Sequence, residues 1–95
     1  MNHNEALSTL EAQANGPEIE IEYCVPCGLL PAAEETAHAV LERAGQRISG
    51  LRLVPSQGGV FKVRAGGEPI FDKARDGYDV DEIVRRVGRR LDAAS

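Results

Sequence analysis

The feature that most constrains this chain is a short alternating segment that leads directly into two closely spaced cysteines. From Glu18 to Tyr23, glutamates alternate strictly with isoleucines and a tyrosine, which is the period of a β-strand with one buried face and one face in water. Cys24 and Cys27 follow at once, and beyond Pro31 the apolar residues recur at helical spacing. We therefore expect a strand, a Cys-Val-Pro-Cys loop and a helix, in this order.

The glutamates of the first strand also limit where helices pack. Glu18, Glu20 and Glu22 share one face of the strand, and a helix packed over them would bury three charges at a high cost in free energy. The sheet is therefore expected to carry its helices on one face only.

The helix after the cysteines has clear start and stop signals. It is expected to begin near Leu29 to Pro31, since proline is tolerated in a first helical turn, and to end at Gly45. Cys27 then lies close to the N-terminus of this helix.

Three further strands are expected. The second, marked by residues 51–53 and extending back to Ile48 at most, must run parallel to the first, because a helix returns the chain to the same end of the sheet. The third covers residues 61–65, where apolar and basic residues alternate. A tight turn at residues 66–67 leads into a short fourth strand, and Pro69, which lacks an N–H donor, predicts that this strand lies at an edge.

A final helix is expected after a capping box formed by Asp79 and Glu82. The polar segment at residues 72–79 is interpreted as a solvated loop that connects the last strand to this helix, and the alternative is a segment that flanks the active end or contacts a partner. The apolar side of the helix is formed by Val80, Ile83, Val84, Val87 and Leu91, and its exposed side by Arg85, Arg86, Arg89 and Arg90. The order βαβββα predicts an α/β fold with two layers, a four-stranded mixed sheet and both helices on one face.

The domain organisation follows from length and composition. A chain of 95 residues is long enough for one domain with one apolar core and too short for two. We expect a flexible N-terminal tail at residues 1–17 and a single domain at residues 18–95. If the first and third strands are neighbours, Glu20 or Glu22 should face Lys62 or Arg64.

The charge balance bears on partners and location. A net charge of -4 argues against non-specific binding to nucleic acid or to an anionic membrane. No run of residues is apolar enough to span a bilayer, and the first residues lack the basic start and apolar stretch of a signal peptide. A cytoplasmic location is therefore the expectation, and the oligomeric state stays open.

The two cysteines are the candidate catalytic residues. A disulfide between positions 24 and 27 closes so short a loop that it stabilises the fold little, so a reactive role is favoured. A thiol at a helix N-terminus has a lowered pKa, because the unpaired N–H groups and the helix dipole stabilise its thiolate. We therefore predict thiol–disulfide exchange through Cys24 and Cys27, by way of a mixed disulfide with a protein or a small thiol, and without a bound cofactor.

Two other functions remain as alternatives. Zinc needs two more ligands than this pair supplies, and His38 falls about three helical turns from Cys27, so a closed site within one chain is not expected. A metal shared between two chains stays open, although we predict no metal ligands. The second alternative is a non-catalytic module whose binding to a partner protein depends on the redox state of the cysteines.

The sequence also resembles a known family. The motif Tyr-Cys-Val-Pro-Cys-Gly at residues 23–28, with Pro31, and the later segments at 59–63, 70–73 and 76–78 are similar to the Rdx family, which includes selenoprotein W and its relatives. This resemblance covers residues 18 to about 92. It implies a thioredoxin-like fold, a redox role, and selenocysteine in some relatives at the place of Cys27. By analogy with ordinary thioredoxins, the first cysteine is favoured as the more exposed nucleophile, whereas a selenol at the place of Cys27 in the relatives would make the second position the attacker, so which cysteine attacks stays open.

Overall fold

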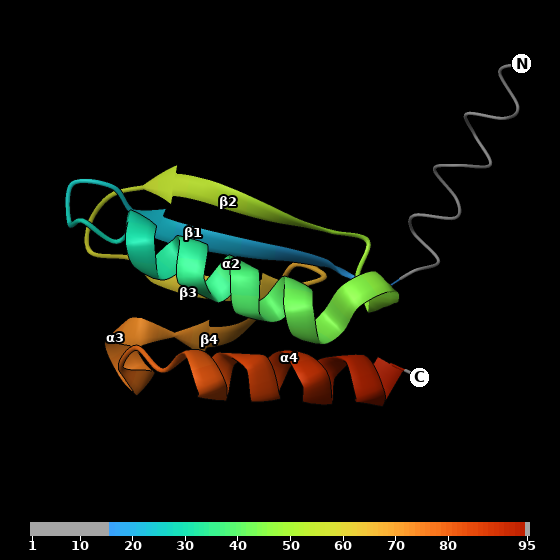
Figure 1. The fold of residues 1–95 in the computed structure, drawn as a ribbon. Helices are drawn as coiled ribbons and strands as arrows, with labels where there is room; N and C mark the ends of the chain where they lie inside the picture. The colour runs from blue at the N-terminus through green and yellow to red at the C-terminus, as the bar shows by residue number, and fades with distance from the viewer. Residues whose placement is uncertain (1–15, 95) are drawn as a thin grey trace, which may run out of the picture.

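The computed structural model describes residues 16–94, and its main elements follow the predicted βαβββα order (Figure 1). Of the expected tail, only Gly16 and Pro17 lie among the described residues, and the Pro17 carbonyl accepts a hydrogen bond from the N–H of Ser49 at 3.0 Å. The elements are β1 (Glu18–Cys24), α2 (Leu30–Ala44), a 3-10 turn (Gly45–Arg47), β2 (Gly50–Ser56), β3 (Phe61–Ala65), β4 (Glu68–Asp72), α3 (Lys73–Asp76) and α4 (Val80–Ala94).

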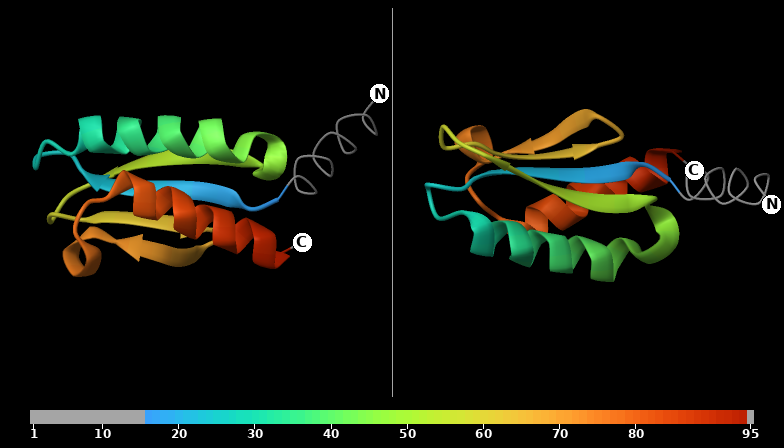
Figure 2. Two further views of the ribbon diagram at one scale, coloured as in Figure 1. Left: turned by 60° about the horizontal axis from the view of Figure 1, so that its bottom comes forward. Right: turned by 90° about the horizontal axis from the view of Figure 1, so that it is seen from above.

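The strands form one mixed sheet in the order β2-β1-β3-β4. β1 pairs with β2 in parallel and with β3 in antiparallel orientation, and β3 pairs with β4 in antiparallel orientation. The two long helices lie side by side on one face of this sheet (Figure 2). The predicted two-layer α/β fold, with a four-stranded mixed sheet and both helices on one face, is therefore confirmed.

The open face of the sheet carries the charged side chains of β1 and its neighbours. Glu20 lies opposite Arg64 in the register of β1 and β3, and Glu22 lies opposite Lys62. The carboxylate of Glu20 accepts hydrogen bonds from Arg64 at 3.1 Å and from Arg52 at 2.9 Å. The predicted cross-strand pairing is confirmed, and each such pair contributes only about 0.2 to 1 kcal/mol.

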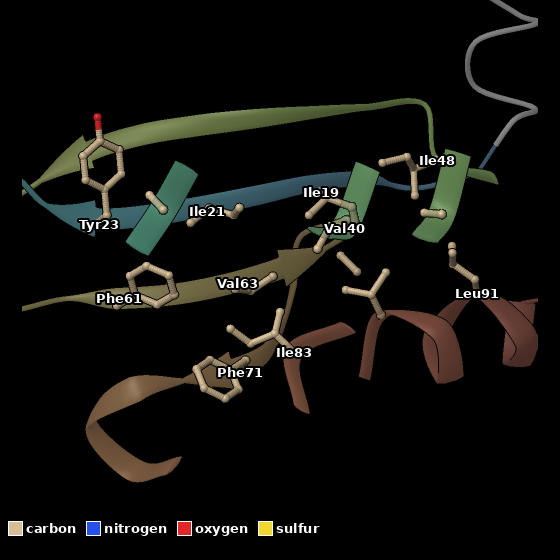
Figure 3. Close-up of a cluster of buried hydrophobic side chains, with 14 residues drawn as sticks. Ile19, Ile21, Tyr23, Val40, Ile48, Phe61, Val63, Phe71, Ile83 and Leu91 are labelled. Atoms are coloured by element: carbon tan, nitrogen blue, oxygen red, sulfur yellow. The ribbon is translucent and has the colours of Figure 1, made fainter. Parts of the chain in front are cut away.

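The other face of the sheet packs against the helices and forms an aliphatic and aromatic core (Figure 3). The alternation within β1 and β3 explains this, because every second residue of each strand points toward the helices. The buried members are Ile19, Ile21, Tyr23, Phe61, Val63, Ala65 and Phe71 from the sheet, Ala33, Val40, Ala44, Ile83, Val87 and Leu91 from the helices, and Ile48 from the connection before β2.

Strand β2 differs from its prediction at both ends. Ile48 precedes the strand, although its side chain is buried in the core, and the strand continues through Pro55 to Ser56. Proline is tolerated there because β2 is an edge strand, so a backbone position that faces solvent needs no N–H donor.

The segment before α4 was predicted to be an irregular loop, and this prediction is wrong in part. The segment contains the short helix α3. The side chain of Asp72 accepts a hydrogen bond from the N–H of Ala74 at 3.0 Å and so caps the start of this helix. Gly77 ends it with a φ of 71°, and its N–H bonds to the Lys73 carbonyl at 2.8 Å.

Helix α4 begins one residue after Asp79, as its cap predicted. The side chain of Asp79 accepts a hydrogen bond from the N–H of Glu82 at 3.1 Å. Only this half of the capping box forms, because the carboxylate of Glu82 is engaged by arginines of the same helix. Among the described helices, none combines the length and the apolar composition that a membrane crossing requires.

Candidate functional site

The cysteine loop is fixed by backbone hydrogen bonds to the turn that joins β2 to β3. The N–H of Cys24 donates to the Val60 carbonyl at 2.8 Å, and the N–H of Val25 donates to the Ser56 carbonyl at 2.9 Å. These bonds extend the pairing of β1 with both of its neighbours to the last residue of the strand. The start of the loop is therefore held in place by the sheet.

The rest of the loop is a tight turn that ends at helix α2. The N–H of Gly28 donates to the Val25 carbonyl at 3.0 Å, and Gly28 adopts a φ of +75°, a conformation that glycine reaches without steric cost. The N–H of Leu29 reaches back to the Cys24 carbonyl at 3.3 Å. Cys27 therefore lies two residues before Leu29, the residue that precedes α2.

Cys24 and Cys27 are joined by a disulfide, with their Cα atoms 5.3 Å apart. This separation lies within the usual range for disulfides. The structure therefore brings together the two residues that the sequence predicted as the reactive pair.

The two cysteines differ sharply in exposure, and the expectation that the first is the more exposed one is wrong. Cys24 is 0% exposed, because it is the last residue of a strand that has a neighbour on either side. Cys27 is exposed, because it belongs to the turn beyond the sheet. A partner from solution therefore meets Cys27 first.

The N-terminus of α2 is suited to stabilise a thiolate at Cys27. Leu29, which flanks the helix, makes no side-chain cap, and the first turn of the helix contains no acidic residue. The first N–H groups of a helix have no partner within it, and together with the helix dipole they favour a nearby negative charge. No carboxylate of the first turn competes for this position.

A hydrogen-bonded group attaches the segment after α3 to the first half of α2. The hydroxyl of Thr36, which is fully buried, donates to the Ala32 carbonyl at 2.8 Å and lies 3.1 Å from the hydroxyl of Tyr78. The Tyr78 hydroxyl also reaches the Glu35 carboxylate at 3.0 Å. Burial raises the pKa of Tyr78, so this hydroxyl stays protonated and can donate.

The ring of Tyr78 also takes part in the packing at this end of the sheet. It meets the ring of Phe61 edge to face, with 5.5 Å between the ring centres, and Phe61 is the β3 partner of Tyr23 beside Cys24. From the sequence, Tyr78 is considered only as part of the segment 72–79, either as a connecting loop or as a flank of the active end, and as part of the family resemblance at 76–78. The one available signal was a single aromatic residue in an otherwise polar segment.

His38 lies away from the cysteines, as predicted from its place on α2. Its imidazole is 3.4 Å from the carboxylate of Glu42, one helical turn further on, and both side chains are exposed. Across residues 16–94 the structure contains no cluster of three or more His, Cys, Asp or Glu side chains arranged to hold a metal. His3 lies outside the described residues.

Comparison with known proteins agrees with the geometry of the loop and the sheet. The sequence profile of the Rdx family matches residues 18–89. A protein of known crystal structure from Bordetella parapertussis is 32% identical, with a TM-score of 0.74, and the match covers 79% of this chain and 98% of that one. A selenoprotein W-related protein from Vibrio cholerae shares the fold at 23% identity, with a TM-score of 0.75 over 80% of this chain and 98% of its own. Among curated proteins no match was found.

Proposed function

Because this chain belongs to the Rdx family, we propose that it carries out thiol–disulfide exchange through Cys24 and Cys27 with a protein or small-molecule partner in the cytoplasm. The observation that carries this proposal is the pairing of one buried and one exposed cysteine at disulfide distance, directly before a long helix. The chemistry needs no bound cofactor, because the two sulfur atoms themselves take up and release the electrons.

The proposed reaction starts from the reduced protein. The Cys27 thiolate attacks one sulfur of a partner disulfide, forming a mixed disulfide and releasing the other partner sulfur as a thiolate, which takes up a proton. The Cys24 thiolate then attacks the sulfur of Cys27, which releases the second partner thiol and forms the Cys24–Cys27 disulfide. Two electrons pass from the protein to the partner, and a thiol reductant returns the protein to its starting state.

The difference in exposure supports this assignment of roles. The exposed Cys27 is accessible to a partner, whereas the buried Cys24 is reached only by its neighbour in the loop. With Cα atoms 5.3 Å apart, the second step is intramolecular and gains the large rate advantage of a positioned nucleophile.

The roles are tested with single-cysteine variants and a disulfide reagent that forms a stable adduct. In the Cys24→Ser variant, Cys27 should trap the reagent as a lasting mixed disulfide, which mass spectrometry detects. In the matched Cys27→Ser variant, the buried Cys24 should form this adduct at least about tenfold more slowly, since reaction depends on access of the thiolate. Faster trapping by Cys24 would reverse the assignment.

The reaction itself is tested on the wild-type protein. Equilibration with thiol and disulfide buffers should give a reversible internal disulfide with a potential of roughly -180 to -300 mV, an interval that includes the potentials of thioredoxins and glutaredoxins. Repeated turnover with a disulfide substrate and a thiol reductant would support the proposal that the protein is an enzyme. Binding of a partner that depends on oxidation, without turnover, would instead support a redox-sensitive interaction module.

A further inference from the structure

The loops around the disulfide are free of charged residues. No Asp, Glu, Lys or Arg occurs from residue 23 to 33 or from residue 53 to 61, in a chain of which 27% is charged. The backbone bonds from Cys24 and Val25 to Val60 and Ser56 join these two segments, and their turns lie together at one end of the molecule (Figure 1). The two longest uncharged stretches of the sequence therefore meet at the disulfide.

Exposed apolar side chains flank the reactive sulfur. Val25 is 50% exposed and Leu30 is 42% exposed, two positions before and three positions after Cys27. Among residues 16–94 the third exposed side chain of this kind is Leu41, at 48%, in the second half of α2. Two of the three exposed large apolar residues thus surround the cysteine, where they are available to a partner.

The charged residues that border this surface are of both signs: Glu22 and Glu34 adjoin the first uncharged segment, and Arg52 and Lys62 adjoin the second. The Glu22 carboxylate accepts hydrogen bonds from Ser56 and Arg64, which lower its pKa, and Glu35 accepts one from Tyr78. Glu22 also forms an ion pair with Arg64 at 3.0 Å, so these two charges offset each other. Within the two uncharged segments themselves, a small disulfide that carries several carboxylates finds no cation.

We propose that the substrate of Cys27 is a protein disulfide, or a protein thiol in the reverse direction, whose cysteine lies in an extended segment between apolar side chains. This inference rests on the proposed exchange reaction and names its substrate class. Contacts with Val25 and Leu30 would remove apolar surface from water in the encounter with such a segment. Roughly 60 Å² of apolar area buried in this way corresponds to about a tenfold gain in rate.

The test compares three disulfides as oxidants of the reduced full-length protein. Two are disulfide-linked dimers of a synthetic peptide whose single cysteine is flanked either by leucines or by glutamates, and the third is glutathione disulfide. Each rate constant is divided by the rate of the same disulfide with dithiothreitol, which removes differences in intrinsic reactivity. The leucine-flanked peptide should react about tenfold faster than either of the other two on this scale.

Variants then assign the preference to the surface around Cys27. Leu30→Gln combined with Val25→Thr should lower the ratio of the leucine-peptide rate to the glutathione rate several-fold. The matched control is Leu41→Gln, which replaces an equally exposed leucine of the same helix away from the cysteines and should leave this ratio unchanged. Circular dichroism verifies that the variants are folded.

The possible outcomes separate the two proposals. Equal normalised rates for the three disulfides, or an unchanged ratio in the Leu30 and Val25 variant, would overturn the apolar substrate class and leave the exchange reaction standing. If the reduced protein is oxidised by none of the three, the exchange reaction itself fails.

Discussion

Tyr23 and Tyr78 lie at the same end of the sheet, but their hydroxyl groups differ in hydrogen bonding. The hydroxyl of Tyr78 lies within hydrogen-bond distance of Thr36, of Glu35 and, at 3.3 Å, of the Ala32 carbonyl. Within residues 16–94, the hydroxyl of Tyr23 has no hydrogen-bond partner, and it points away from Phe61 (Figure 3). The same change, tyrosine to phenylalanine, therefore removes hydrogen bonds at one site and none at the other.

Tyr78→Phe should lower the free energy of unfolding by about 0.5 to 1.5 kcal/mol, the usual net value of a hydrogen bond. The buried Thr36 hydroxyl keeps its bond to Ala32, so the loss should not grow to that of an unpaired buried group. Urea unfolding measures the difference. Tyr23→Phe is the control and should be neutral within error, and an equal effect of both changes would contradict the assigned role of the Tyr78 hydroxyl.

At single residues, the sequence predicted the pairing of the two cysteines better than their exposure. The spacing of Cys24 and Cys27 predicted a disulfide pair before a helix. It did not predict that Cys24 is buried, because that burial depends on two neighbouring strands and on the bond from its N–H to Val60, which lies far away in the sequence. Non-local contacts of this kind leave no local pattern.

At the scale of elements, the first turns of α4 are held to α3 by a network of arginines and carboxylates. Arg85, Arg86 and Arg89 all donate to the carboxylate of Glu82, and Arg86 also reaches Asp76 at 2.9 Å. The guanidinium of Arg86 lies 5.3 Å from the ring centre of Phe71, so this side chain is half-buried. The arginines of the exposed helix face are therefore largely engaged within the protein.

The network makes stability depend on pH. Hydrogen bonds from Arg86 first, and then from Arg85, lower the pKa of Glu82 from 4.5 to about 2, and the hydrogen bond from Arg75 is the main cause of a lowered pKa at Asp76. A carboxylate with a lowered pKa in the folded state binds fewer protons than in the unfolded chain at acidic pH. Its stabilising effect is therefore complete above about pH 4.5 and is lost as the pH falls toward 2.

Glu82→Gln should lower the melting temperature at pH 7 and change it only slightly at pH 2, where Glu82 is about half protonated in the folded state and almost fully protonated in the unfolded chain, so that little of its stabilising effect remains. Thermal unfolding across this range measures the difference. Glu34→Gln is a suitable control, because among the described residues Glu34 has no ion-pair partner, and it should give a small difference at every pH. A Glu82→Gln effect that persists at pH 2 would show that the lost stability does not come from the charge.

Elements with a regular hydrophobic pattern were predicted well from the sequence, and elements without one were predicted poorly. The strict alternation predicted β3 with its observed bounds and β1 to within one residue, since β1 continues to Cys24, because one face of each strand is buried and the other is wet. Helix α3 has only four residues, too few for a helical period, and is defined by its caps at Asp72 and Gly77. Strand β2 continues through Pro55, which becomes understandable only when its edge position is known.

At the scale of the whole molecule, the exposed part of the cysteine loop lies outside the main hydrophobic cluster, although the side chain of Cys24 is itself fully buried. The cluster of buried side chains described for residues 16–94 contains neither cysteine. It is built from β1, β3, β4, the two long helices and Ile48 before β2, and the loop between β1 and α2 extends beyond it at one end of the molecule (Figure 1). Changes in the disulfide should therefore leave the core intact.

Reduction of the disulfide should lower the free energy of unfolding by about 2 kcal/mol, since a cross-link between residues only three positions apart removes little entropy from the unfolded chain. The reduced protein should keep its far-ultraviolet circular dichroism and unfold in one cooperative step in urea. Phe71→Ala in the oxidised protein is the reference for damage to the core, because this ring is fully buried and its removal costs about 3 to 5 kcal/mol. Loss of cooperative unfolding on reduction would mean that the disulfide is a structural cross-link, and it would argue against a protein that passes through its reduced state in every reaction cycle.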